Sequence, residues 1–132
     1  MTPSKPSSVI ADLCSVVARE RGLTLLVLFG SRARGDAGIH ADWDFGFLSD
    51  SSVDPLTIMA ELAAAVGSER LDLVDLTRAG GLLRYRAARD GVLVYEARPG
   101  TFDRFRFEAA RFWYDAEPVL RPGYDAILDG LG

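Results

Sequence analysis

The stretch LFGSRARGDAGIHADWDFGF, residues 28–47, is the part of the sequence that decides the fold. Gly30 and Ser31 follow an apolar run, ten residues intervene, and Asp42 and Asp44 then open a second apolar run. We expect a strand, a tight turn and another strand. Because side chains alternate along a strand, the two aspartates should lie side by side on one face. The aromatic residues that alternate with them should point into the core: Trp43, Phe45 and Phe47.

The residue types in this stretch suit a phosphate that is bound together with a metal ion. Two carboxylates held close together repel each other unless a cation neutralises them, and Mg²⁺ usually binds one or two carboxylates plus substrate phosphates. In the turn, Gly30 lets backbone amides approach a phosphate, Ser31 can donate its hydroxyl, and Arg34 lies one helical turn further on. The implied ligand is a metal-bound nucleoside triphosphate.

A purely structural interpretation of the same residues is also open. Gly30 and Ser31 could close an ordinary loop, and Asp42 and Asp44 could do no more than solvate a strand end. Either half of the pattern alone would favour that interpretation. The two halves together, at this spacing and between two apolar runs, favour the functional one.

Composition limits the chain to one compact domain. Its 132 residues are 48% hydrophobic and 10% aromatic, which excludes general disorder. No apolar stretch approaches the roughly 18 residues of a membrane span, and the amino-terminal MTPSKPSS lacks the layout of a signal peptide, so we expect a cytoplasmic protein. Cys14, the single cysteine, lies among apolar residues and is expected to be a buried, inert thiol.

The charge of the chain bears on its partners. A formal net charge of −4 at pH 7 argues against a general nucleic-acid binder, because such binding depends on a basic surface. A protein or a small molecule fits better. Arginine supplies all but one of the 15 basic residues, and many of these arginines lie at residues 84–89 and 104–111, where local basic patches remain possible.

Periodicity and end signals predict the elements before the turn. A helix at residues 8–21, capped by Ser7 or Ser8 and ended by Gly22, precedes a strand at residues 23–29. This strand is a nearly unbroken apolar run, so it should be central in its sheet and covered on both faces. It carries the Gly-Ser turn at its carboxyl end.

A further helix and a third strand follow the second apolar run. Asp54 is expected to cap the helix and Gly67 to end it. The segment LDLVDL, residues 71–76, then predicts a strand whose alternation places Asp72 on one face and Asp75 on the other. One of these two carboxylates should join the site, and Asp75, near the strand end, can be satisfied by solvent.

The last third of the chain predicts a helix at residues 82–89, a strand at 91–96, a long helix at 102–116 capped by Thr101, and a short segment at 124–128. The long helix has two apolar stripes. The stripe suited to the core of the domain is Phe102, Phe105, Ala109, Phe112 and Trp113. The stripe beside it is Phe107, Ala110 and Tyr114. A small domain rarely needs both, so we expect the second stripe to be exposed and to meet a partner.

The Gly-Ser turn, the spacer and the Asp-x-Asp strand together resemble the signature of the DNA polymerase beta nucleotidyltransferase superfamily. The order of the elements is similar to its compact core over nearly the whole chain. The resemblance implies an α/β (α+β) fold of the polymerase-beta-like nucleotidyltransferase type, with a small mixed sheet flanked by helices and a C-terminal helical extension. We expect a core at residues 1–98 and an extension at 99–132 that packs on the core or on a partner, in a single domain overall.

The resemblance also implies roles for individual residues. Gly30, Ser31 and Arg34 would hold the triphosphate. In the superfamily the third acidic residue lies early on its strand, and the residues around it here resemble the family's Val-Asp-Leu-Val, which selects Asp72 over Asp75. The residues that would bind metal and carry out catalysis are then Asp42, Asp44 and Asp72. They would hold two Mg²⁺ ions that bridge the attacking and leaving oxygens at the α-phosphate of ATP.

The size, the spacing and the tail FEAARFWYDAEPVLRPGYDAIL are similar to those of the minimal nucleotidyltransferase antitoxins that pair with HEPN ribonuclease toxins. This resemblance implies transfer of AMP from ATP onto a toxin tyrosine, which silences the ribonuclease. It implies a toxin–antitoxin complex or a homodimer, with no membrane and no specific nucleic acid as partner. The chain departs from the pattern at Ala41, where many relatives have serine, and at the bulky Trp43.

Two other functions stay open. A small-molecule nucleotidyltransferase, for example one that acts on an aminoglycoside, would use the same site but usually needs added substrate-binding elements, which 132 residues scarcely allow. A non-catalytic subunit would neutralise a toxin by contact alone. The mass of the partner after incubation with ATP distinguishes an enzyme from a binder.

Overall fold

The computed structural model describes residues 6–36, 38, 41–51 and 53–115, and the segment at 124–128 lies outside them. The elements in chain order are α1 (Pro6–Val17), β1 (Leu23–Phe29), α2 (Ser31–Arg34), β2 (Trp43–Ser49), α3 (Pro55–Val66), β3 (Leu71–Asp75), α4 (Gly81–Asp90), β4 (Val92–Glu96) and α5 (Thr101–Asp115). Within this part of the chain, no helix is long and apolar enough to cross a membrane.

The four strands form one mixed sheet in the order β3-β2-β1-β4. β1 pairs with β2 and β4 in antiparallel fashion, and β2 pairs with β3 in parallel fashion. The predicted α/β fold class is confirmed, and β1 is an inner strand as its apolar run indicates. Because β1 runs against both neighbours, its carboxyl end and the amino ends of β2, β3 and β4 all lie at the same end of the sheet. This is the end that carries the Gly-Ser turn.

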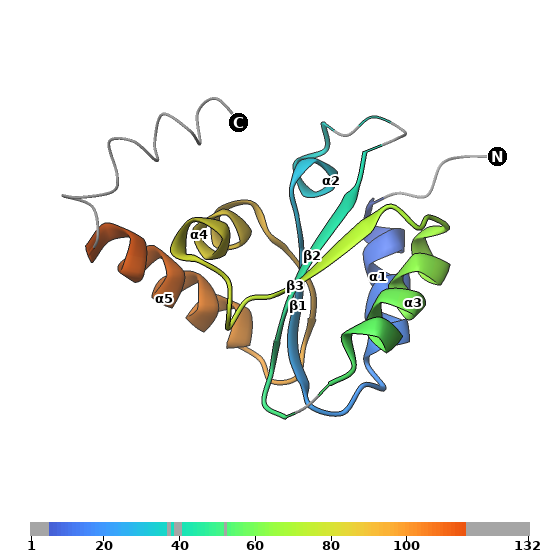
Figure 1. Cartoon of the computed structure of the whole chain (residues 1–132), viewed down its shortest axis with the longest axis horizontal. Coiled ribbons are helices and arrows are strands. Elements are labelled where there is room, and N and C mark those ends of the chain that lie inside the picture. The colour runs from blue at the N-terminus through green and yellow to red at the C-terminus, as the bar shows by residue number, and fades with distance from the viewer. Residues whose placement is uncertain (1–5, 37, 39–40, 52, 116–132) are drawn as a thin grey trace.

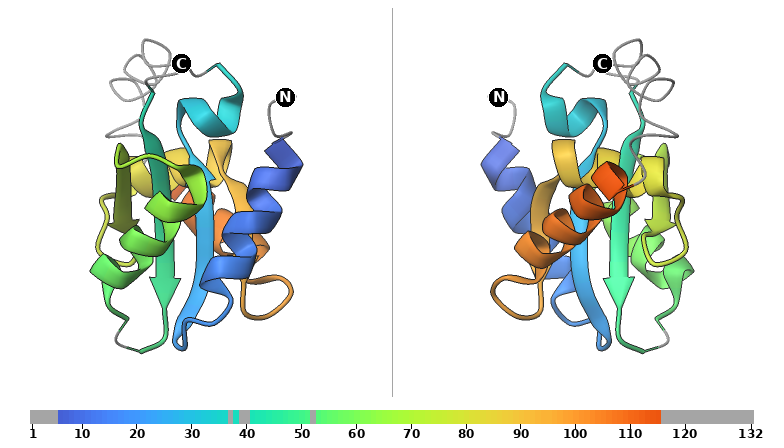
Figure 2. Two further views of the ribbon diagram at one scale, coloured as in Figure 1. Left: turned by 90° about the vertical axis from the view of Figure 1, so that its right-hand side faces the viewer. Right: turned by 90° about the vertical axis from the view of Figure 1, so that its left-hand side faces the viewer.

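Helices cover both faces of the sheet, with α1 and α3 on one side and α4 and α5 on the other (Figure 1). The two views in Figure 2 each look onto one of these helical layers. Alternate side chains of β1 enter opposite cores. Those on the side of α1 and α3 include Leu26 and Leu28, which pack with Leu13, Phe45 and Ile58. Those on the side of α4 and α5 are Leu25, Val27 and Phe29, which pack with Ala87 and Phe105.

The ends of α3 follow the sequence signals. The Asp54 carboxylate accepts a hydrogen bond from the backbone amide of Leu56 at 3.0 Å, and its other oxygen accepts one from the Thr57 hydroxyl at 2.9 Å. Gly67 ends the helix in the left-handed conformation, with φ 70°. The predictions for this helix are confirmed because the cap and the stop are both local in sequence.

The prediction for the first helix is wrong at both ends. α1 begins at Pro6, so Ser7 and Ser8 lie inside the helix and do not precede it. It ends at Val17, where the apolar stripe ends, since the next three residues, Ala18, Arg19 and Glu20, add no large apolar side chain to the buried face. Gly22 lies instead in the turn that leads into β1, where its φ of 86° favours glycine.

The predicted cap of α5 is also wrong. Thr101 is the first residue of the helix, and its hydroxyl donates to the carbonyl oxygen of Arg98 at 2.7 Å. The side chain that accepts from the helix start belongs to Glu96, whose Oε1 is 3.0 Å from the amide nitrogen of Phe102. Because Glu96 lies at the end of β4, this cap ties α5 to the sheet.

The two stripes of α5 differ in burial, as expected, with one exception. Phe107 and Tyr114 are 67% and 49% exposed. The residues of the first stripe that are buried are Phe102, Phe105, Ala109 and Trp113. Phe112 is 58% exposed and lies against the start of α4 at Gly81, so its placement in the core stripe is wrong. Trp113, one residue on, takes the core position and stacks on Tyr85.

Candidate active site

Two carboxylates lie side by side at the sheet end that carries the Gly-Ser turn. Asp44 pairs with Phe29 of β1 on one side and with Asp72 of β3 on the other. Phe45 and Leu73, the next residues on the two strands, point into the core beneath α1 and α3. Asp44 and Asp72 therefore share the opposite face, on the side of α4. The structure brings these two predicted residues together.

The turn touches one of these carboxylates directly. Gly30 has φ 74° and ψ −159°, a combination that is accessible essentially only to glycine. A Cβ atom on Gly30 would collide with Oδ2 of Asp44. Glycine at this position therefore lets the chain turn into α2 and leaves room for the Asp44 side chain beneath it. The first residue of α2 is Ser31, which is half-buried.

The electrostatics of Asp44 show a site with excess negative charge. Burial raises the pKa of Asp44 above its usual value, and the nearby charges of Asp72 and Asp42 raise it further. The positive charges of Arg86 and Arg34 oppose this increase but do not cancel it. A bound cation would relieve the repulsion, and carboxylate oxygens are ligands that suit Mg²⁺. The donor set therefore fits the metal that the sequence implies.

Asp42 is placed differently from the expectation. It precedes β2 and is not part of the strand, and its Oδ1 lies 3.4 Å from Nε of Arg70, with the Asp42 side chain 55% exposed. The backbone of Arg70 also accepts a hydrogen bond from the amide of Trp43 at 2.9 Å, which holds the pair together. Within the described ranges, no three Asp, Glu, His or Cys side chains are arranged to hold a metal ion. The contact between Asp42 and Arg70 would have to break before Asp42, Asp44 and Asp72 could bind one metal ion together.

Asp75 lies away from this cluster. It pairs with Phe47, on the opposite face and near the other end of the sheet. Its Oδ1 accepts a hydrogen bond from the amide of Thr77 at 2.9 Å, and its Oδ2 lies 3.7 Å from Nε of Arg78. Asp75 therefore stabilises the turn after β3.

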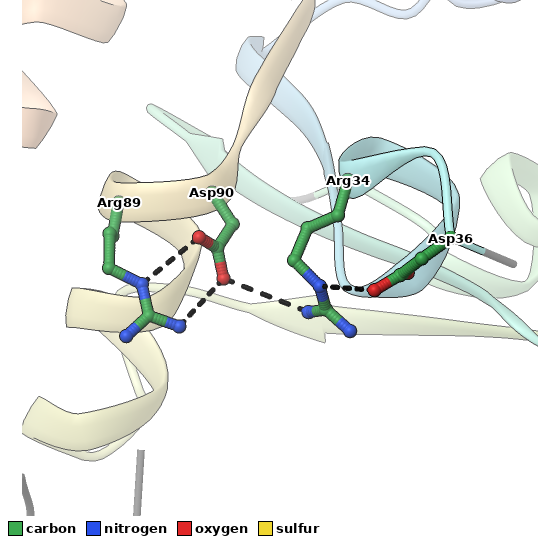
Figure 3. Close-up of polar contacts among 4 residues, drawn as sticks. All are labelled: Arg34, Asp36, Arg89 and Asp90. Carbon is green, nitrogen blue, oxygen red and sulfur yellow. Dashed lines mark hydrogen bonds and ion pairs between the residues drawn. The ribbon is translucent and has the colours of Figure 1, made fainter. Parts of the chain in front are cut away.

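Arg34 connects the turn to the end of α4 (Figure 3). Its Nε lies 3.3 Å from Oδ2 of Asp36, and its Nη1 lies 3.8 Å from Oδ2 of Asp90. Since the charge of Arg34 also lowers the pKa of Asp44, its guanidinium is within electrostatic reach of the carboxylate pair. Arg34 therefore lies close to the turn, to the carboxylates and to the end of α4.

Sequence reasoning missed the contribution of α4. Asp90 accepts hydrogen bonds from Arg89 at 3.0 and 2.8 Å, and this contact holds the pKa of Asp90 below its usual value against the opposing effect of burial. The charges of Arg89, Arg34 and Arg86 lower the pKa further. No local pattern in the sequence signals this contribution: Asp90 lies two residues before β4, and only the pairing of β4 with β1 brings the end of α4 to the end of the sheet where the turn lies.

Arg32 explains the two departures from the family pattern. Its guanidinium lies 4.5 Å from the ring centroid of Trp43, and its Nη2 donates to the carbonyl oxygen of Ala41 at 3.0 Å. Trp43 in turn stacks on Phe45, with ring centroids 6.3 Å apart. A cation–π contact and a backbone hydrogen bond thus brace the strand start where Ala41 offers no hydroxyl.

The family follows from a direct comparison. A family model described as polymerase beta, nucleotidyltransferase, matches residues 12–99. The chain belongs to this family. The match includes every residue of the polymerase beta nucleotidyltransferase signature, from Gly30 to Asp72, and it confirms the resemblance seen in the sequence.

Individual relatives agree with the family. The chain is 35% identical over 96 residues to the protein adenylyltransferase MntA of Aphanizomenon flos-aquae (strain 2012/KM1/D3), and the match covers 64% of each chain, slightly less than two thirds of that relative's length. A chain in the crystal structure of a toxin–antitoxin with AMP-PNP is 20% identical, with a TM-score of 0.71 over 90% of this chain and 98% of that one. A chain in the complex of the tri-AMPylated Shewanella oneidensis HEPN toxin with its MNT antitoxin is 19% identical, with a TM-score of 0.68 over 94% and 99%. At these identities the structural matches show a shared fold.

Proposed function

We propose that this protein is a magnesium-dependent nucleotidyltransferase that transfers AMP from ATP to a hydroxyl group of a partner protein. The observation that carries the proposal is the contact between Gly30 and Asp44, with Asp72 paired beside Asp44, because it sets a phosphate-binding turn against two carboxylates. The 35% identity to a protein adenylyltransferase supports AMP as the transferred group and a protein as the acceptor.

The residues divide the work between binding and chemistry. Ser31 and Arg34 hold the triphosphate by hydrogen bonds to its oxygens. The residues proposed to hold two Mg²⁺ ions are Asp42, Asp44 and Asp72. When bound, these ions supply charge stabilisation at the α-phosphate and at the leaving pyrophosphate. Asp72, the exposed member of the Asp44–Asp72 pair, accepts the proton of the acceptor hydroxyl. The hydroxyl oxygen forms a bond to the α-phosphorus while the bond from the α-phosphorus to pyrophosphate breaks.

We propose further that the acceptor is a tyrosine of a HEPN-type ribonuclease toxin, so that the protein acts as an antitoxin. The fold shared with the MNT antitoxin of an AMPylated HEPN toxin supports this part of the proposal. The exposed aromatic side chains of Phe107 and Tyr114 offer a surface for such a partner. In this proposal residues 1–98 form the catalytic core and residues 99–132 the extension that packs on the core or docks the partner.

The test is intact-protein mass spectrometry of a HEPN-type toxin from the same organism, incubated with this protein, ATP and Mg²⁺. Each transferred AMP adds about 329 Da to the toxin. A parallel reaction with Asp44→Asn is the control and should show no added mass. A toxin that binds this protein and loses its ribonuclease activity without any gain in mass would show that the protein neutralises by contact alone.

A further inference from the structure

The carboxyl end of α4 lies at the same end of the sheet as the proposed site. β4, which follows α4 directly, pairs with β1 through Val92 and Leu28, next to the residues that lead into the Gly-Ser turn. Asp90, the last residue of α4, has a side chain only 14% exposed and lies 3.8 Å from Arg34 of α2. α4 and α2 therefore face each other across the sheet end (Figure 3).

Arg86 lies one helical turn before Asp90, on the same edge of α4. It is half-buried, and Ala87 beside it is fully buried in the core beneath α4 and α5. Asp90 itself lies 3.8 Å from Arg34, and the positive charge of Arg86 contributes to the lowered pKa of Asp90, so the Arg86 guanidinium is within electrostatic reach of the α2–α4 contact.

The other arginines of α4 are engaged within the fold. Arg84 donates to the carbonyl oxygen of Leu76 and lies over the ring of Phe105 at 5.3 Å, and Arg89 binds Asp90. Arg86 forms no hydrogen bond or ion pair with any residue that the structure describes. An arginine held half-buried beside an acidic site, with its donors unused there, can bind an anion that enters the site.

We propose that Arg86 is a further triphosphate-binding residue, which meets the phosphates from α4 while Ser31 and Arg34 meet them from α2. The inference rests on the proposed function. Its physical basis is charge: a triphosphate must approach a site that already holds Asp44 and Asp72, and Arg34 alone is shared between Asp36 and Asp90. A second guanidinium lowers the electrostatic cost of that approach and can bind two phosphate oxygens at once.

The experiment compares the affinities of the wild-type protein and of Arg86→Ala for Mg²⁺-ATP and for AMP by isothermal titration calorimetry. Arg86→Ala should bind ATP about 10- to 100-fold more weakly, the range expected when a charged hydrogen-bond donor is lost. AMP, which lacks the β- and γ-phosphates, should bind both proteins equally. Arg86→Lys should recover part of the ATP affinity, because lysine keeps the charge but not the paired donors. The control is Arg78→Ala, whose side chain is 88% exposed near the opposite end of β3 and which should bind ATP as the wild type does.

The outcomes separate the inference from the proposed function. If Arg86→Ala binds ATP as tightly as the wild type does, the inference is wrong and the proposed function stands. If ATP and AMP both bind more weakly and the melting temperature falls, Arg86 supports the fold only, and the inference is again wrong. Arg86→Lys gives the same comparison if the alanine variant does not fold. A wild-type protein that binds no Mg²⁺-ATP contradicts the proposed function itself.

Discussion

Replacing Asp44 with asparagine should make the metal-free protein more stable. Asp44 and Asp72 are register-paired on adjacent strands, which lie about 5 Å apart, and we take this spacing as the separation of the two charges. Two unit charges at that distance repel by about 1 kcal/mol in water and by about 3 kcal/mol at an effective dielectric constant near 20. Because Asp72 is exposed, the lower value applies, and we expect Asp44→Asn to gain about 1 kcal/mol. For a domain of this size that corresponds to a rise of about 4 °C in melting temperature.

The stability that Asp44→Asn gains should depend on pH, and the raised pKa of Asp44 fixes the direction of this dependence. The pKa of Asp44 is raised in the folded protein above the ordinary value of 3.8, so the native state holds this proton more tightly than the unfolded chain does. The free energy of unfolding therefore falls as the pH rises from that ordinary value through the raised one, and stays lower above it. The advantage of Asp44→Asn should be present at pH 7 and disappear below the ordinary carboxyl pKa.

The assay is thermal unfolding followed by circular dichroism in buffer with a chelator, at pH 7 and at pH 3.5. The matched control is Asp12→Asn, an exposed position on α1, which should leave the melting temperature nearly unchanged. Addition of Mg²⁺ should raise the melting temperature of the wild type more than that of Asp44→Asn, because a ligand stabilises the state that binds it. The double variant Asp42→Asn with Asp44→Asn should transfer no AMP.

Two results would refute this reasoning. A metal-free Asp44→Asn protein that melts at or below the wild-type temperature, while Asp12→Asn behaves as expected, would show that repulsion between the carboxylates does not govern the effect of Asp44 on stability. Transfer of AMP by the double variant Asp42→Asn with Asp44→Asn would remove these carboxylates from the chemistry, whatever their effect on stability.

Three further predictions concern the turn and α5. Ser31→Ala and Arg34→Ala should each weaken ATP binding, and Arg34→Ala should weaken it more, because charge-assisted hydrogen bonds are about twice as strong as neutral ones. If both variants bind ATP as tightly as the wild type does, the turn does not bind the triphosphate. Phe107→Ala with Tyr114→Ala should weaken association with the partner by at least about 2 kcal/mol, measured by sedimentation or calorimetry, and should leave the affinity for ATP unchanged. A sharp loss of thermal stability with unchanged association would instead exclude this face of α5 as the docking surface. Gly30→Ala should cost about 1–3 kcal/mol of stability by denaturant titration and also lower transfer, since its Cβ displaces the Asp44 carboxylate.

The sequence predicts the strands and the sheet end that carries the site because these depend on local patterns. The alternation of residues 43–47 fixes which side chains enter the core and so puts Asp44 on the opposite face. The apolar run of β1 predicts an inner strand, and the Gly-Ser turn at its end is next to the start of β2 in any antiparallel pair. Burial of the core is enough to specify this register.

The contacts that the sequence does not predict join elements far apart in the chain. Asp42 binds Arg70 because β3 pairs in parallel with β2, which brings the residue before β3 to the start of β2. Arg34 meets Asp90 only because β4 pairs with β1 on its other edge. Neither pairing partner is encoded in a local pattern, so the charged residues that gather around the site become visible only in the folded sheet.

The site places mutually repelling carboxylates on a strand that is otherwise well packed. Asp44 is partly buried next to Asp72 and close to Asp42, an arrangement that raises its pKa and that we expect to destabilise the metal-free fold. The surrounding structure compensates: Arg32 stacks on Trp43, and Trp43 stacks on Phe45 at the start of the same strand. Natural proteins commonly retain such destabilising charges where activity requires them. Aromatic packing on one face of the strand start therefore offsets the repulsion between carboxylates on the other face. Under the proposed function, this strand start gains most stability when a cation and a triphosphate bind.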